Sequence, residues 1–132
     1  MSHPHYHAKS SAKRFGGIAS DYHAIHEWFD QVKAHLPDVR HRSILHSSFG
    51  VFLAQQVFGE VIVRKSDGKE VPTRLLGEQH VLEDLGFIPT VQDWLKDLPM
   101  RAWMIKGARS LEADGAKAAP RATRKRSPRR AK

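Results

Sequence analysis

The chain contains no cysteine among its 132 residues. This absence excludes disulfide bonds and thiolate metal ligands, and it predicts a protein of the reducing cytoplasm. No run of about 18 apolar residues occurs, so we expect no transmembrane helix and no membrane partner. The N-terminal stretch MSHPHYHAKSSAKRFGG lacks the apolar centre of a secretory signal. A chain of this length therefore predicts one cytoplasmic domain around one hydrophobic core.

Acidic residues are scarce only in the C-terminal part of the chain. The formal charge is +8, but residues 117–132 carry eight Lys and Arg and no Asp or Glu, and the other 14 basic residues balance 14 acidic ones. With two prolines and no large apolar residue, this stretch predicts a flexible, disordered basic tail over 105–132. Its cations are candidates for non-specific nucleic-acid binding, chiefly Arg124, Lys125, Arg126, Arg129 and Arg130.

The hydrophobic pattern of the remaining chain predicts a mainly α, small α+β domain over 20–104, preceded by a polar N-terminal arm over 1–19. A β-hairpin is expected at about 60–75, because Asp67-Gly68 lies between two β-branched runs. It would be inserted after the second of about four helices. The helices are expected at about 21–35, 39–58, 77–85 and, after a Thr90 cap, 91–98.

Histidine is unusually frequent, with nine residues, eight of them in the first 46 positions. Imidazole suits both proton transfer at neutral pH and the binding of first-row metals. On the expected first helix, His26 and Asp30 lie four residues apart at the edge of the apolar stripe, so the carboxylate can hydrogen-bond the ring or share a metal with it. The other two candidate ligands are His46 and His80. His46 is in line with Gly50, which would permit close approach of another backbone or a ligand. His80 precedes Asp84 by four residues.

The other histidines are expected to have different roles. His41 falls within the apolar stripe of a helix over 39–58 and is expected in the core. On that helix it lies about 140° from His46, so the two could not chelate one ion. The three histidines of the N-terminal arm are expected to be mobile, and His23 and His35 to face solvent. A structural histidine with satisfied hydrogen bonds is the alternative for each candidate.

Three functional hypotheses follow, and whether the protein is an enzyme stays open. The first is a metal-binding domain for zinc, manganese, iron or nickel through His26, Asp30, His46 and His80. It could be a metal-dependent hydrolase, with Glu78 as base or additional ligand. The second is a non-enzymatic interaction module whose basic tail binds nucleic acid. The third is a metal-free acid–base enzyme that uses His26 or His80, each with a neighbouring aspartate.

Several strings of the chain resemble a known family: HPHYHAKSSAKRFGG, YHAIHEWFDQVKAH, RHRSILH, GEQHVLEDLG and IPTVQDWL. This family of small bacterial and phage proteins is catalogued only as a domain of unknown function. The resemblance covers about residues 2 to 104 and leaves the basic tail outside. It implies a self-contained cytoplasmic domain and brings no established activity, cofactor or catalytic residue.

Overall fold

A computed structural model describes residues 3–106 of the chain. The described residues fall into two units, 3–97 and 98–106, and the second contains a helical segment at 102–106. The first unit is mainly helical with one two-stranded hairpin, which confirms the predicted fold class. Its α-helices are α1 (Pro4–Phe15), α2 (His23–Phe29), α3 (Ser48–Phe58), α4 (Thr73–Leu85) and α5 (Val91–Leu95). Its 3-10 helices are η1 (Ala19–Asp21), η2 (Gln31–Ala34) and η3 (Val39–Arg42), and its strands are β1 (Val61–Val63) and β2 (Glu70–Pro72).

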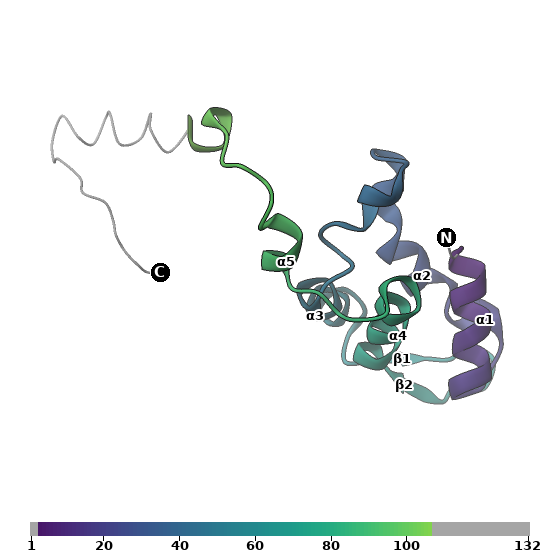
Figure 1. The fold of residues 1–132 in the computed structure, drawn as a ribbon. Helices are drawn as coiled ribbons and strands as arrows, with labels where there is room; N and C mark the ends of the chain where they lie inside the picture. The colour runs from purple at the N-terminus through teal and green to yellow at the C-terminus, as the bar shows by residue number, and fades with distance from the viewer. Residues whose placement is uncertain (1–2, 107–132) are drawn as a thin grey trace, which may run out of the picture. The chain divides into compact units, whose positions relative to one another are not determined.

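Helix α4 is the central element of this unit, because it contacts α1, α2, α3 and both strands (Figure 1). The apolar core around it includes Phe29, Val51, Leu76 and Val81, all buried. Tyr22, Ile25 and Phe29, from the stretch expected as the first helix, are buried in this core. A central helix that is covered on several sides must bury its polar residues as well, and α4 buries Gln79 and His80.

The hairpin predicted around Asp67-Gly68 is confirmed. Strands β1 and β2 pair antiparallel, with Ile62 opposite Val71, and Gly68 adopts a φ of 76° in the connection, where a side chain would be strained. Helix α4 begins directly after β2. The hydroxyl of its first residue, Thr73, donates to the Gly59 carbonyl at 2.6 Å. The hairpin thereby fixes the start of the helix that carries His80.

The N-terminal segment differs from the expected arm. Residues 4–15 form α1, with Pro4 in the first turn and the His3 side chain accepting from the His5 amide at 3.2 Å. Its buried face consists of His7, Ala8 and Ser11. The expectation of a mobile arm was therefore wrong for this segment. The sequence did not indicate the helix because its buried side chains are polar or small and form no apolar stripe.

The long helix expected over 39–58 is also wrong in its first half. Only η3 and α3 are helical, and residues 43–47 form turns between them. The chain folds back so closely that a Cβ on Gly50 would lie 1.7 Å from the Leu45 carbonyl oxygen. Glycine at this position is therefore required by the backbone of the turn, and the continuous helix that separated His41 from His46 does not exist.

The remaining boundaries differ less from prediction. Helix α4 begins at Thr73 rather than at about Gly77, and the stretch expected as one helix over 21–35 is divided into η1, α2 and η2. The predicted Thr90 cap of α5 is confirmed, with Asp93 completing a capping box. No helix among the described residues is long and apolar enough to cross a membrane. The predicted nucleic-acid-binding residues lie outside the described residues: Arg124, Lys125, Arg126, Arg129 and Arg130.

Candidate metal centre

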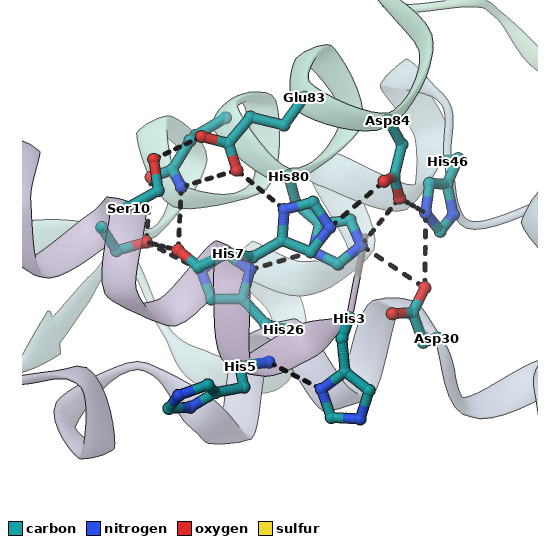
Figure 2. Close-up of polar contacts among 12 residues, drawn as sticks. His3, His5, His7, Ser10, His26, Asp30, His46, His80, Glu83 and Asp84 are labelled. Carbon is teal, nitrogen blue, oxygen red and sulfur yellow. Dashed lines mark hydrogen bonds and ion pairs between the residues drawn. The ribbon is translucent and has the colours of Figure 1, made fainter. Parts of the chain in front are cut away.

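Buried histidines converge beside α4 in the first unit. Five imidazoles are at most 1% exposed, and four of them contact Asp30 or Asp84. Figure 2 shows His46 and His80 beside these two aspartates. The five are His7, His26, His41, His46 and His80. Burial of so many polar rings is unusual because each unpartnered ring nitrogen loses its hydration. Their partners therefore decide what the cluster can do.

Four side chains form a compact group of possible ligands. Asp30, His46, His80 and Asp84 each offer one donor atom, and these atoms all lie within 4.8 Å of one another. His46 Nε2 lies 2.9 Å from Asp84 Oδ2 and 3.5 Å from Asp30 Oδ1. His80 Nε2 lies 3.5 Å from each of the same two carboxylate oxygens. Two buried imidazoles thus face two carboxylates.

Each member of this four-residue group is held by a different local feature. Asp30 is the C-cap of α2, and His80 and Asp84 share one face of α4 at i and i+4 spacing. His46 belongs to the turn before α3, where the Trp94 indole donates to its carbonyl at 2.8 Å. Phe29 stacks on the His80 ring at 4.9 Å between centroids. Gly77 permits this stack, because a Cβ there would lie 3.0 Å from Phe29 Cζ.

His7 is placed between two carboxylates. Its Nδ1 lies 2.7 Å from Glu83 Oε1, and its Nε2 lies 3.2 Å from Asp84 Oδ1. Burial acts to lower the pKa of His7, but its contacts with Asp84 and Glu83 outweigh burial and raise that pKa. Both ring nitrogens face acceptors, so the geometry suits a protonated His7. A second cation, Arg42, approaches Asp84 Oδ1 at 3.5 Å.

The hydrogen bonds of Gln79 limit the atoms to which the Ser11 hydroxyl can donate. Gln79 Nε2 donates to the His7 carbonyl at 3.1 Å and to Glu83 Oε1 at 3.2 Å. Its Oε1 is then an acceptor, 2.9 Å from Ser11 Oγ. Ser11 Oγ also lies 3.0 Å from the His7 carbonyl. Because both neighbours can only accept, the single hydroxyl proton of Ser11 points to one of them.

This orientation fixes the tautomer of two histidines. Since the Ser11 proton is used elsewhere, His26 Nε2 must donate to Ser11 Oγ, which lies 2.8 Å away. A neutral His26 then carries its lone pair on Nδ1, 2.9 Å from His80 Nδ1. His80 must supply the proton of this contact from its own Nδ1. The lone pair of a neutral His80 is therefore on Nε2, which faces Asp30 and Asp84.

The electrostatics of the cluster are consistent with neutral His26 and His80 rings and with ionised aspartates. Burial lowers the pKa of His26 to about 2, with the neighbouring His80 adding to the effect. Burial likewise lowers the pKa of His80 to about 4, although Asp30 acts in the opposite direction. For Asp30, burial acts to raise the pKa, but the contact with His80 outweighs it and the pKa is lowered. The pKa of Asp84 is lowered in the same way, by its bonds to His46 and His7.

A second group, His7, His26 and His80, also brings three donor atoms together. It is a weaker candidate for a metal because His7 directs both nitrogens at carboxylates and suits a cation itself. Its contact between His26 and His80 is already explained by one shared proton. The candidate metal centre is therefore the group of Asp30, His46, His80 and Asp84.

The structure brings together three of the four ligands expected from sequence. Asp30, His46 and His80 belong to the four-residue group, whereas His26 lies behind His80 and contacts its Nδ1. Glu78, expected as base or ligand, belongs to neither group and instead pairs with Arg74 at 3.0 Å. Helical spacing explains this, since positions 78 and 80 project about 200° apart on α4.

Asp84, His7 and His41 were not expected as part of the metal site. Asp84 takes the place predicted for His26, and its signal in the sequence was the four-residue spacing after His80. His7 was assigned to a mobile arm, yet it is 1% exposed and contacts Asp84. His41 is buried as predicted, but it faces Asp30 rather than an apolar neighbour. His35 is exposed as predicted, and His23 is partly buried.

Comparison with known proteins agrees with the family resemblance. The model of a family described as a domain of unknown function (DUF6915) matches residues 2–104, which contain every residue of the cluster. No curated protein matches the chain. No solved structure matches it either. The chain therefore belongs to the DUF6915 family, a domain of unknown function.

Proposed function

We propose that this domain binds one divalent transition-metal ion through Asp30, His46, His80 and Asp84. The observation that carries the proposal is the position of His80 Nε2. This atom is buried, has no hydrogen-bond partner among the described residues, and lies 3.5 Å from two carboxylate oxygens. A lone pair facing two anions is repulsive, and a cation placed between the three atoms turns this repulsion into attraction.

The spacing of the donor atoms fits a metal ion. Four ligand atoms at about 2.1 Å from a tetrahedral ion lie about 3.4 Å apart. The observed separations within the group are 2.9 Å for one pair and 3.5 Å for three others. Two imidazoles and two carboxylates, without a thiolate, suit zinc, manganese, iron or nickel. The two negative charges also match those of a divalent ion.

Burial of the group favours metal binding over hydrolysis. The side chains of its four members are at most 7% exposed. A hydrolytic centre needs a coordination position that substrate and water can reach. Two surface cavities of the described residues are lined by other side chains, one including Phe52 and Glu78 and the other Phe87 and Trp94. The finer hypothesis of a metal-dependent hydrolase has no such support.

A metal ion here would join segments that are distant in sequence. Asp30 ends α2, His46 lies in the turn before α3, and the other two ligands are on α4. Because the apolar core of so small a domain is limited, an ion that binds only the folded chain adds directly to its stability. A metal-free acid–base enzyme would use the same His80 lone pair, and metal content separates the two hypotheses.

Metal analysis of untagged protein, purified without chelator, tests the proposal. We expect about one equivalent of zinc, manganese, iron or nickel per chain, and its loss in the Asp84→Asn variant. The matched control is Glu27→Gln, an exposed acid on α2, which should keep the metal. Protein that contains none of the four metals, and takes up none after they are added, would contradict the proposal.

A further inference from the structure

We infer that His41 is a fifth ligand of the ion, so that the centre has three histidines and two aspartates. This inference rests on the proposed function and deepens it, since it determines coordination number and metal preference. His41 is not one of the four residues whose donor atoms all lie within 4.8 Å of one another. Its polar contact with that group is with Asp30, where Nε2 lies 3.3 Å from Oδ1.

The tautomer of His41 is fixed by the backbone. Its Nδ1 lies 2.9 Å from the carbonyl oxygen of Asp38. A carbonyl oxygen only accepts, so Nδ1 carries the proton and a neutral ring carries its lone pair on Nε2. A histidine with Nδ1–H bound to a backbone carbonyl presents Nε2 in the form that binds a metal. His41 is thus prepared for ligation at the nitrogen that faces Asp30.

The same Asp30 oxygen is surrounded by three imidazole nitrogens. Asp30 Oδ1 lies 3.3 Å from Nε2 of His41 and 3.5 Å from Nε2 of both His46 and His80. Hydrogen bonds on the far sides of the His41 and His80 rings leave these two Nε2 atoms without a proton when the rings are neutral. Two lone pairs therefore converge on one carboxylate oxygen. An ion beside that oxygen would satisfy both nitrogens once His41 Nε2 moves towards the four-residue group, since its donor atom does not belong to that group.

The segment that carries His41 is held by local hydrogen bonds. Asp38 caps η3 by accepting from the Arg40 amide at 2.9 Å, and its carboxylate also receives the Arg40 guanidinium at 2.7 Å. The ring of His41 is 1% exposed and lies edge-on to His46, with centroids 5.9 Å apart. These contacts already place the His41 ring next to the group. Ligation therefore requires only a shift of η3 towards Asp30, without refolding of the segment.

A fifth ligand changes which metals fit. Structural zinc sites are almost always four-coordinate and tetrahedral. Five nitrogen and oxygen ligands from three imidazoles and two carboxylates instead suit iron(II), manganese(II) or nickel(II), which accept five or six ligands. The alternative for His41 is a protonated ring that donates to Asp30 without touching the ion. The two arrangements differ in the number of imidazoles bound to the metal.

Cobalt(II) loaded onto the metal-free full chain counts those imidazoles. Each ring bound through Nε2 keeps a proton on Nδ1, and the paramagnetic ion shifts its NMR signal far outside the normal range. We expect three such exchangeable signals in the wild type and two in His41→Gln. His35→Gln, which alters an exposed histidine, should keep three. Because the count is made first on the wild type, it does not depend on whether the variant folds.

The visible spectrum of the same sample gives a second measurement. Five-coordinate cobalt(II) absorbs less strongly than four-coordinate cobalt(II), so removal of His41 should increase the intensity of the visible bands. Two shifted signals in the wild type, with strong tetrahedral bands, would overturn the inference while the proposed metal centre stands. Failure of the wild type to bind cobalt(II) at all would overturn both.

Discussion

The two nitrogens of the His80 ring lie in different surroundings. On the Nδ1 side, a chain of hydrogen bonds runs through His26 and Ser11 to Gln79, with each contact between 2.8 and 2.9 Å. On the Nε2 side, the ring faces Asp30 and Asp84 without a hydrogen-bond partner among the described residues. The same buried ring is thus fully partnered on one side and opposed by like-polarity atoms on the other.

This difference shows how a structural network and a site can share one residue. Buried polar groups are nearly always hydrogen-bonded, so an exception needs an explanation. Here Nε2 of His80 lacks a hydrogen-bond partner because the hydrogen bonds on the other side of the ring place the only proton of a neutral His80 on Nδ1. The Nδ1 side would then hold the ring in the form that binds a metal, and the Nε2 side would be the site.

The largest expected effect is the loss of stabilisation by metal in the Asp30→Asn variant, on the Nε2 side of His80. An amide in place of the carboxylate can donate to lone pairs of the surrounding imidazoles, so we expect the metal-free variant to be at least as stable as the wild type. Metal should stabilise the wild type by about 4 kcal/mol at 1,000 times its Kd and the variant by far less. Chemical unfolding with chelator and with added metal measures both. Equal metal stabilisation of both proteins would contradict the assignment of Asp30 as a ligand.

The next effect is on the Nδ1 side, in Ser11→Ala. Loss of the hydroxyl leaves His26 Nε2 and Gln79 Oε1 without a partner, which should destabilise the protein by about 1–3 kcal/mol with or without metal. Metal affinity should fall by about 10–100-fold, because the ring of His80 loses its support. Ser10→Ala, which removes a hydroxyl bound to the outer oxygen of Glu83, is the control. An unchanged metal affinity in Ser11→Ala would show that the two sides of His80 are independent.

The sequence predicted the helical class, the hairpin and three members of the four-residue group. His80 and Asp30 could be identified because each has a polar partner four residues away on a helix. His46 was identified for a reason that the structure corrects: Gly50 lies near it in order to admit the Leu45 backbone. The glycine indicated that another group approaches closely at this position, but it could not indicate that this group is the backbone of the preceding turn.

Other parts of the site could not be predicted because they depend on tertiary contact. Helix α1 buries His7 and Ser11 rather than an apolar stripe, so hydrophobic periodicity gives no signal for it. His41 and His46 were separated by assuming a regular helix, whereas a tight turn brings both to Asp30. Periodicity detects faces that pack through apolar atoms, and this cluster is packed through polar ones.

A smaller effect concerns pH and tests the neutral state of the two rings in the metal-free protein. The folded pKa values of His80 and His26 are about 4 and about 2, below the ordinary 6.5. As pH falls below 6.5 the unfolded chain binds protons that the folded chain does not. Each ring should therefore reduce the free energy of unfolding by about 1 kcal/mol between pH 6.5 and 5.5.

Urea unfolding in chelator at several pH values measures this dependence. The raised pKa of His7 acts in the opposite sense: its contribution is present below pH 6.5 and is lost as pH rises through the raised pKa. The lowered pKa values of Asp30 and Asp84 matter only below their ordinary value of 3.8. His80→Phe should weaken the dependence between pH 6.5 and 5.5. A wild type whose stability does not fall in that window would show that His80 is protonated and donates to the two aspartates.

The smallest effect on either side of His80 is expected from deleting residues 116–132. The contacts of the cluster among the described residues come from residues 7 to 94, so metal content and the free energy of unfolding should stay unchanged. The proposed role of the tail predicts a loss elsewhere: the full chain should bind duplex DNA with a salt slope of about 0.9 per phosphate contact, and the truncated chain should not. Undiminished DNA binding after truncation would assign it to the domain. A loss of metal would mean that the basic segment supports the metal centre, and would contradict the assignment of metal binding to the domain alone.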